Sequence, residues 1–126
     1  MKDSPHRLRL HCNSAIPERY RDSMRNLLAF DLGASNGRAI LGQFDGTRVT
    51  LHELHRFENN YIEMNGVFYW DLPYLYQQLK LGFLAFRQAN MGELDCFGTD
   101  AWGVDYGLLD KNGNLLSNPR AYRYAR

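Results

Sequence analysis

The 126-residue sequence has only two cysteines, Cys12 and Cys96, and neither belongs to a Cys-x-x-Cys pair. Two cysteines cannot build a disulfide framework, so a reducing, cytoplasmic compartment is the simplest expectation. The sequence also lacks an apolar stretch approaching the ~18 residues of a membrane-spanning helix. The N-terminus has no apolar segment of the secretory-signal type. We therefore expect a soluble protein with no membrane partner.

An excess of charge of either sign is also missing. Fifteen lysines and arginines against fourteen aspartates and glutamates give a formal net charge of +1. Such a balance offers no general electrostatic attraction for nucleic acid. Apolar residues make up 44% of the chain, which is typical of globular proteins. The length suits one domain with a real hydrophobic core.

Residues 1–23 and residues 24–126 differ in character. The first segment holds four arginines and two prolines and shows no sustained helical or strand period. Its composition predicts an unstructured leader. Regular apolar patterns begin directly after Met24. We therefore assign residues 24–126 to the folded part.

Short apolar runs separated by turn residues dominate the first half of the folded part. Residues 27–30 form a run typical of a strand buried on both faces. A glycine-rich turn at 33–37 separates them from a second predicted strand at 39–44. Asp45-Gly46 then predicts a tight turn into a third strand with alternating polarity. This order predicts an antiparallel meander.

The next segment predicts a hairpin, a helix and a parallel strand. Asn65-Gly66 favours a two-residue turn, and Asp71 can cap a helix that follows. Apolar residues recur at helical spacing from 72 to 86. A strand at 95–100 then follows a crossover helix, so it should pair parallel to the first strand. A closing hairpin is expected around Asn112-Gly113.

Asp31 and Arg38 flank the glycine-rich turn, and a plain hairpin needs neither of them. The turn is no Walker A loop and no Gly-x-Gly-x-x-Gly loop, and it leads into a strand. Its backbone N–H groups, with Ser35 and Asn36, could contact phosphate oxygens, and Arg38 could add a charge-assisted bond. Asp31 is placed to orient Mg²⁺ through water. The alternative is an ordinary hairpin with a solvated aspartate and arginine.

A second dense stretch, GTDAWGVDYGLLD, groups Asp100, Trp102, Gly103 and Asp105 around one bend. An indole face packs well against the C–H groups of a sugar, and carboxylates accept hydrogen bonds from its hydroxyls. These residues therefore form a candidate sugar site. The alternative is a buried core tryptophan beside a turn glycine.

Five segments, taken together, resemble the FGGY carbohydrate kinases and, within them, the rhamnulokinases. They are FDLGASNGRAIL, HRFENN, NGVFYWDL, GTDAWGVDYGLLDKNG and PRAYR, in this order. The resemblance covers residues 25–126 and the N-terminal part of a usual family member. It implies an α/β fold of the actin-like ATPase (ribonuclease-H-like) type. The expected element order is β-β-β-α-β with an added hairpin.

The resemblance implies ATP-dependent phosphorylation of a ketose, most directly L-rhamnulose to L-rhamnulose 1-phosphate, with ATP and Mg²⁺. The phosphate end of ATP is then assigned to Ala34, Ser35, Asn36, Gly37 and Arg38. Gly103 is assigned to the sugar, beside Trp102, Asp100 and Asp105, and Asp31 to the metal. Glycerol kinases carry an Arg-Glu pair where this chain has Trp102-Gly103-Val104. This difference favours the rhamnulose branch.

Two residues depart from the family pattern. Asn36 stands where a serine is expected, and Tyr124 where an aspartate is expected. By the same resemblance, the catalytic base and the adenosine pocket lie beyond residue 126, so we expect the isolated chain to be inactive. An uncovered sheet edge and apolar face predict self-association. The residues expected to be exposed there are Leu27, Phe30, Phe97 and the helix stripe around Leu79 and Phe83.

Two alternatives belong to other functional classes. One is a small non-catalytic module that binds a sugar or nucleotide. The other is a ribonuclease-H-like nuclease, in which Asp31 and Asp100 would supply two of the metal-binding carboxylates. His52 and His55 make a poor metal pair, because residues three apart on a regular strand face opposite sides.

Overall fold

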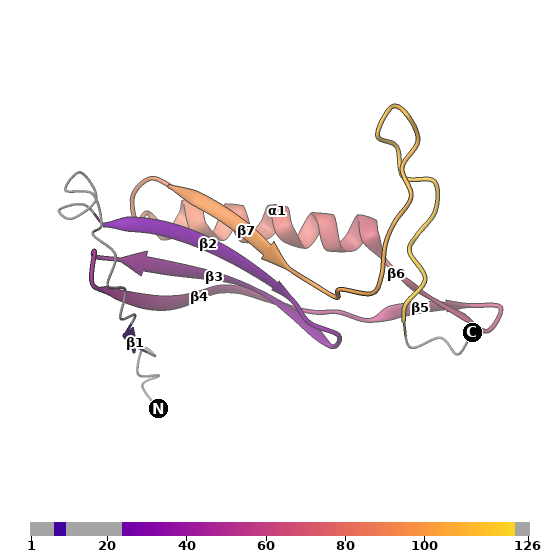
Figure 1. Cartoon of the computed structure of the whole chain (residues 1–126), viewed down its shortest axis with the longest axis horizontal. Coiled ribbons are helices and arrows are strands. Elements are labelled where there is room, and N and C mark those ends of the chain that lie inside the picture. The colour runs from indigo at the N-terminus through magenta and orange to yellow at the C-terminus, as the bar shows by residue number, and fades with distance from the viewer. Residues whose placement is uncertain (1–6, 10–23, 123–126) are drawn as a thin grey trace.

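The computed structural model describes the backbone of residues 7–9 and all atoms of residues 24–122. Figure 1 shows a twisted sheet with one long helix along one face and a hairpin beyond one end of the sheet. The elements are β1 Arg7–Arg9, β2 Arg25–Leu32, β3 Asn36–Phe44, β4 Arg48–Glu58, β5 Tyr61–Met64, β6 Val67–Trp70, α1 Leu72–Ala89 and β7 Cys96–Asp100. In this part of the chain no helix is long and apolar enough to cross a membrane.

The main sheet is mixed, with strand order β1-β4-β3-β2-β7. β2, β3 and β4 form the antiparallel meander, and β7 lies parallel to β2 after the crossover through α1. β5 and β6 form a separate two-stranded sheet. The expectation of an α/β fold is therefore confirmed. The closing hairpin forms without two regular strands. Leu109 and Leu115 make an isolated bridge, the Leu116 N–H donates to Leu108 O at 2.9 Å, and the Asp110 N–H donates to Asn114 O at 2.8 Å.

β1 lies within the segment that the composition assigns to an unstructured leader. Its backbone pairs antiparallel with β4, Arg7 opposite Thr50 and Arg9 opposite Arg48. For these three residues the structure differs from that expectation, because the edge of β4 offers unpaired backbone groups. Cys12 and Tyr124 lie outside the described residues.

The main core lies between the sheet and α1. Leu28 and Phe30 of β2 pack with Ala39 and Leu41 of β3 beneath the helix. Phe30 is only 1% exposed, so the expectation that it would be uncovered is wrong. Gly82 brings α1 close to the sheet, because a Cβ at this position would lie 2.5 Å from the Phe30 ring.

Both ends of α1 follow from local sequence. The Asp71 carboxylate accepts a hydrogen bond from the Tyr74 N–H at 3.1 Å, and Pro73 occupies the first turn, where its missing donor costs nothing. Asn90 ends the helix in the left-handed conformation with φ of 51°. The predicted helix and its predicted N-cap are confirmed.

A bulge in β4 changes which side chains face α1. Ala39 pairs with His55 while the next residue, Ile40, pairs with Glu53, so one residue of β4 is skipped. His52 and His55 are therefore opposite Leu41 and Ala39, on the face that the helix covers. The expectation that they face opposite sides is wrong. His55 Nε2 lies 2.8 Å from Oε1 of Gln78 in α1.

Candidate functional site

A charged cluster lies at the carboxyl end of β2, on the sheet face that α1 does not cover. Asp31 faces away from the helix, since Phe30 beside it faces the core. Arg38 of β3 forms an ion pair with the Asp31 carboxylate, and both side chains remain partly exposed. Asp100 of β7 is the parallel neighbour of Asp31 in the sheet. The Asp31–Arg38 ion pair and Asp100 therefore lie on adjacent strands at the same end of the sheet.

Arg56 extends the charged cluster on the same face. It is the β4 partner of Arg38. Its guanidinium donates to both carboxylate oxygens of Glu53, at 2.9 and 2.6 Å, and to Asn36 Oδ1 at 3.3 Å. The bond from Arg56 lowers the pKa of Glu53, and the same bond raises the pKa of Arg56. Arg56 therefore remains a cation beside the turn.

The glycine-rich turn is tight and is closed by its own backbone. The Gly33 N–H donates to Asn36 O at 2.9 Å, and a Cβ on Gly33 would lie only 2.8 Å from that oxygen. Asn36, Gly37 and Arg38 are already part of β3, so the turn is shorter than the sequence suggests.

Gly37 is required for a reason that the sequence does not reveal. Its φ is not positive, unlike those of the turn glycines Gly46 and Gly66. A Cβ at Gly37 would lie 2.1 Å from Cζ of Phe57, so the aromatic ring of β4 occupies the space of a side chain. Phe57 is buried and belongs to the second core cluster. The glycine therefore permits close packing under the turn rather than an unusual backbone conformation.

Asn59 makes two hydrogen bonds to the turn, and sequence reasoning gave this residue no role. Its backbone N–H donates to Ser35 O at 3.0 Å, and its side-chain Nδ2 donates to Gly33 O at 2.7 Å. Asn59 is 2% exposed. The only sequence feature that pointed to it was its position in the HRFENN segment.

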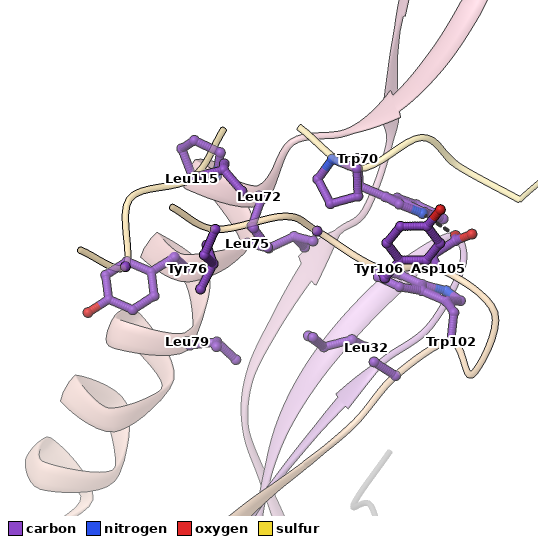
Figure 2. Close-up of a pocket in the computed structure, with 16 residues that line it drawn as sticks. Leu32, Trp70, Leu72, Leu75, Tyr76, Leu79, Trp102, Asp105, Tyr106 and Leu115 are labelled. Carbon is purple, nitrogen blue, oxygen red and sulfur yellow. Dashed lines mark hydrogen bonds between the residues drawn. The ribbon is translucent and has the colours of Figure 1, made fainter. Parts of the chain in front are cut away.

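The second candidate group forms an aromatic cluster next to the N-terminus of α1. The indoles of Trp70 and Trp102 stack with centroids 4.0 Å apart and planes at 10°. The Asp105 carboxylate accepts from Trp70 Nε1 at 2.6 Å and from the Tyr122 N–H at 3.1 Å. Figure 2 shows Asp105 beside the two stacked indoles. Asp105 therefore orders this cluster.

A largely apolar cavity of about 600 Å³ opens beside the stacked indoles. α1 contributes one wall through Leu72, Leu75 and Leu79, and the 101–119 segment contributes the opposite wall (Figure 2). Two buried polar atoms at its margin, Trp102 Nε1 and Asp105 Oδ1, have no hydrogen-bond partner among the described residues. One is a donor and the other an acceptor, which is the pair that a hydroxyl group can satisfy.

The structure thus divides the residues chosen from the sequence into two groups. The turn residues, Arg38 and Asp31 lie on the open face of the sheet together with Asp100. Trp102 and Asp105 lie on the side of α1. Gly103 is exposed, and a Cβ there would meet nothing within 4 Å. In the sheet, Asp100 lies beside Asp31, the metal candidate.

The oxygen donors of the charged cluster fit a hydrated Mg²⁺ ion. Among residues 24–122 no group of three or more His, Cys, Asp or Glu side chains is arranged to hold a metal. Mg²⁺ commonly uses one or two carboxylates with water and substrate phosphates rather than a full protein cage. Asp31 with neighbouring Asp100 supplies such a set.

Comparison with curated proteins gives rhamnulokinases as relatives, although no family model matches the chain. The rhamnulokinase of Bacteroides thetaiotaomicron is 47% identical over 101 residues, covering 79% of this chain and 20% of that protein. The rhamnulokinase of Enterococcus faecalis is 43% identical over 104 residues, covering 81% of this chain and 21% of that protein. The chain therefore spans about a fifth of the length of these relatives.

Among solved structures, gluconate kinase from Lactobacillus acidophilus has a similar fold. The TM-score is 0.63 with 15% sequence identity, over 78% of this chain and 20% of that one. At this identity the likeness supports the fold alone. The sequence relatives confirm the resemblance first seen in the motifs: the chain is similar to a segment of the rhamnulokinases, which belong to the FGGY carbohydrate kinases.

Proposed function

We propose that this chain is the phosphate-binding segment of an ATP-dependent ketose kinase with the actin-like ATPase fold. The observation that carries this proposal is the closed turn at 33–36, held from below by Asn59 and bordered by Asp31 and Arg38 at the carboxyl end of β2. Ligands of α/β sheets bind at the carboxyl ends of strands. The similarity to rhamnulokinases supports L-rhamnulose as the proposed substrate, with L-rhamnulose 1-phosphate as the product.

Residues 34–38 would bind the phosphates of ATP through different kinds of donor. The turn supplies backbone N–H groups, and Ser35 and Asn36 supply polar side chains. Arg38 supplies a cation, which binds phosphate through short, charge-assisted bonds. Asn36 replaces the expected serine but keeps a donor, and its Oδ1 is already occupied by Arg56.

Asp31, with Asp100 beside it, would hold hydrated Mg²⁺, whose chemistry is to neutralise phosphate charge. Without nucleotide, Arg38 neutralises Asp31. Phosphate binding gives Arg38 a second anionic partner and leaves the Asp31 carboxylate available for the cation. The ion pair therefore reduces the repulsion between neighbouring carboxylates before the ligands arrive.

The sugar would lie against the 100–105 bend. Trp102 presents an apolar face, and Gly103 leaves room for close approach because nothing lies near its Cα. Asp105 holds Trp70 and the chain at Tyr122, so it orders the site while its remaining oxygen accepts from a hydroxyl.

Turnover by the isolated chain is not expected. The chain spans about a fifth of its curated relatives, and we assign the general base and the adenosine pocket to the remaining part of such a protein. A missing general base alone typically lowers the rate by ~10²–10⁴-fold. The chain should therefore bind ligands weakly without phosphorylating them.

The test is an amide-resolved NMR titration of the chain with MgATP and, separately, with L-rhamnulose and with D-gluconate. MgATP should shift the amide signals of residues 34–38. L-Rhamnulose should shift the Trp102 indole and Gly103 signals, and D-gluconate should not. Shifts from MgATP that avoid residues 34–38 would contradict the phosphate site, and an equal response to gluconate would contradict the ketose assignment.

A further inference from the structure

We infer that Asn59 is a positioning residue that holds the 33–36 turn in the conformation that receives phosphate. This inference rests on the proposed phosphate-binding function and adds a residue from outside the turn. Asn59 follows directly after β4 and lies beneath the turn between β2 and β3. It is one of few buried polar residues among those described.

Asn59 donates hydrogen bonds to two carbonyl oxygens of the turn, those of Gly33 and Ser35. Nδ2 donates to Gly33 O at 2.7 Å, and the backbone N–H donates to Ser35 O at 3.0 Å. The backbone bond can be made by any residue except proline. The side-chain bond requires a short side chain with an N–H donor, which asparagine has and aspartate lacks at neutral pH.

These bonds determine the direction of the N–H groups in the turn. A trans peptide is planar, and its C=O and N–H point in opposite directions. When Gly33 O and Ser35 O point toward Asn59, the N–H groups of Ala34 and Asn36 point away from it. Asn59 thereby keeps two carbonyl oxygens, which would repel phosphate, away from the side where the ligand binds. The N–H groups of Ala34 and Asn36 face that side as hydrogen-bond donors.

The neighbours of Asn59 on β4 support the same turn at other points. The Phe57 ring fills the space beneath Gly37, and Arg56 Nη1 donates to Asn36 Oδ1 at 3.3 Å. Residues 56, 57 and 59 therefore contact three successive parts of the loop. Asn59 differs from the other two because it alone bonds to backbone carbonyls of the turn itself.

The test compares the full chain with Asn59→Ala, Asn59→Asp and the control Asn60→Ala. Asn60 is the adjacent exposed asparagine, and its side chain makes only a 3.4 Å contact with Glu58. Amide hydrogen exchange of Gly33 and of residue 59, the turn amides whose N–H groups donate to Asn36 O and Ser35 O, reports on the turn. NMR titration with MgATP reports on phosphate binding. Urea unfolding shows whether each variant folds.

We expect both Asn59 variants to exchange the turn amides faster and to bind MgATP roughly tenfold more weakly, as expected for the loss of one buried hydrogen bond. Asn60→Ala should match the parent chain. Binding of L-rhamnulose should be unchanged in all variants, which a general loss of folding would not allow. If Asn59→Ala does not fold, the turn exchange and MgATP affinity of Asn59→Asp, which keeps the side-chain shape, test the inference.

Unchanged exchange of the turn amides in a folded Asn59 variant would overturn the inference. Unchanged MgATP affinity despite a loosened turn would overturn it as well. If the parent chain itself shows no response to MgATP, the proposed phosphate site fails, and faster exchange in the variants would then show only that Asn59 holds the turn.

Discussion

Buried contacts near the turn and near the stacked indoles hold the residues that we propose to face the ligands. Gly37 looks like a turn glycine, yet it lies in β3 and leaves room for the ring of Phe57. Asp105 looks like a free carboxylate for sugar hydroxyls, yet one of its oxygens is bonded to Trp70 Nε1 and the Tyr122 N–H. At this scale, the ligand-facing residues depend on buried neighbours whose roles follow from packing.

Gly37→Ala should destabilise the chain by about 1–3 kcal/mol, the usual cost of overpacking a well-packed site. The added Cβ would lie 2.1 Å from the Phe57 ring, which is itself buried. Urea unfolding measures the cost. In the double variant Gly37→Ala/Phe57→Leu the smaller side chain should recover part of that loss. Equal costs with and without Phe57→Leu would show that the ring is not the obstacle.

At the scale of elements, β4 has a larger role than its sequence suggests. Its bulge brings His52 and His55 to the sheet face that α1 covers. Asn59, directly after β4, supports the turn between β2 and β3. The meander, α1 with its caps, and the parallel β7 could be predicted, because hydrophobic period and turn residues are local. The bulge and the Asn59 contact could not, because they depend on how β4 pairs with β3.

The start of β2 is tied to the chain entering β7 by one carboxylate. Asp95 accepts from Arg25 Nη1 at 2.5 Å and from the Asn26 N–H at 2.8 Å. The bond from Arg25, followed by that from Asn26, holds the pKa of Asp95 below its usual value of 3.8. A lowered folded-state pKa gives stability above the unfolded-state pKa and loses it as pH falls through the folded-state value.

Asp95→Asn should therefore lower the urea midpoint at pH 7, and the difference from the parent chain should shrink as the pH falls from about 5 to about 2. Urea unfolding at several pH values measures this convergence. Glu63→Gln, at an exposed carboxylate of β5, serves as the control and should give parallel curves. A constant difference between parent and Asp95→Asn across this range would refute the role assigned to the carboxylate.

At the scale of the whole molecule, the β7 edge of the sheet is uncovered. All five residues of β7 are exposed, and Phe97, 61% exposed, lies against Phe83 of α1. Further exposed apolar side chains follow in the 104–116 segment: Val104, Tyr106, Leu108, Leu109 and Leu116. An uncovered edge strand and exposed apolar side chains each favour pairing with another chain.

Phe97→Lys should therefore reduce self-association of the chain, because a charged side chain at an edge opposes strand pairing. Sedimentation velocity across a concentration series measures the association. The control Glu63→Lys also introduces a lysine, but on β5 and away from Phe97. It should leave the self-association of the chain as in the parent. A parent chain that stays monomeric at all concentrations would show that the β7 edge does not pair in solution.

We propose that Arg38 and the turn before it receive the phosphates of ATP. The most direct measurement is the MgATP affinity of Arg38→Gln beside Arg48→Gln, both determined by phosphorus-31 NMR. Arg48 is exposed at the start of β4, at the opposite end of the sheet from the turn. Arg38→Gln should weaken binding about tenfold or more, as expected for a charge-assisted bond, and Arg48→Gln should leave it unchanged. Equal affinities for the two variants and the parent chain would contradict the claim.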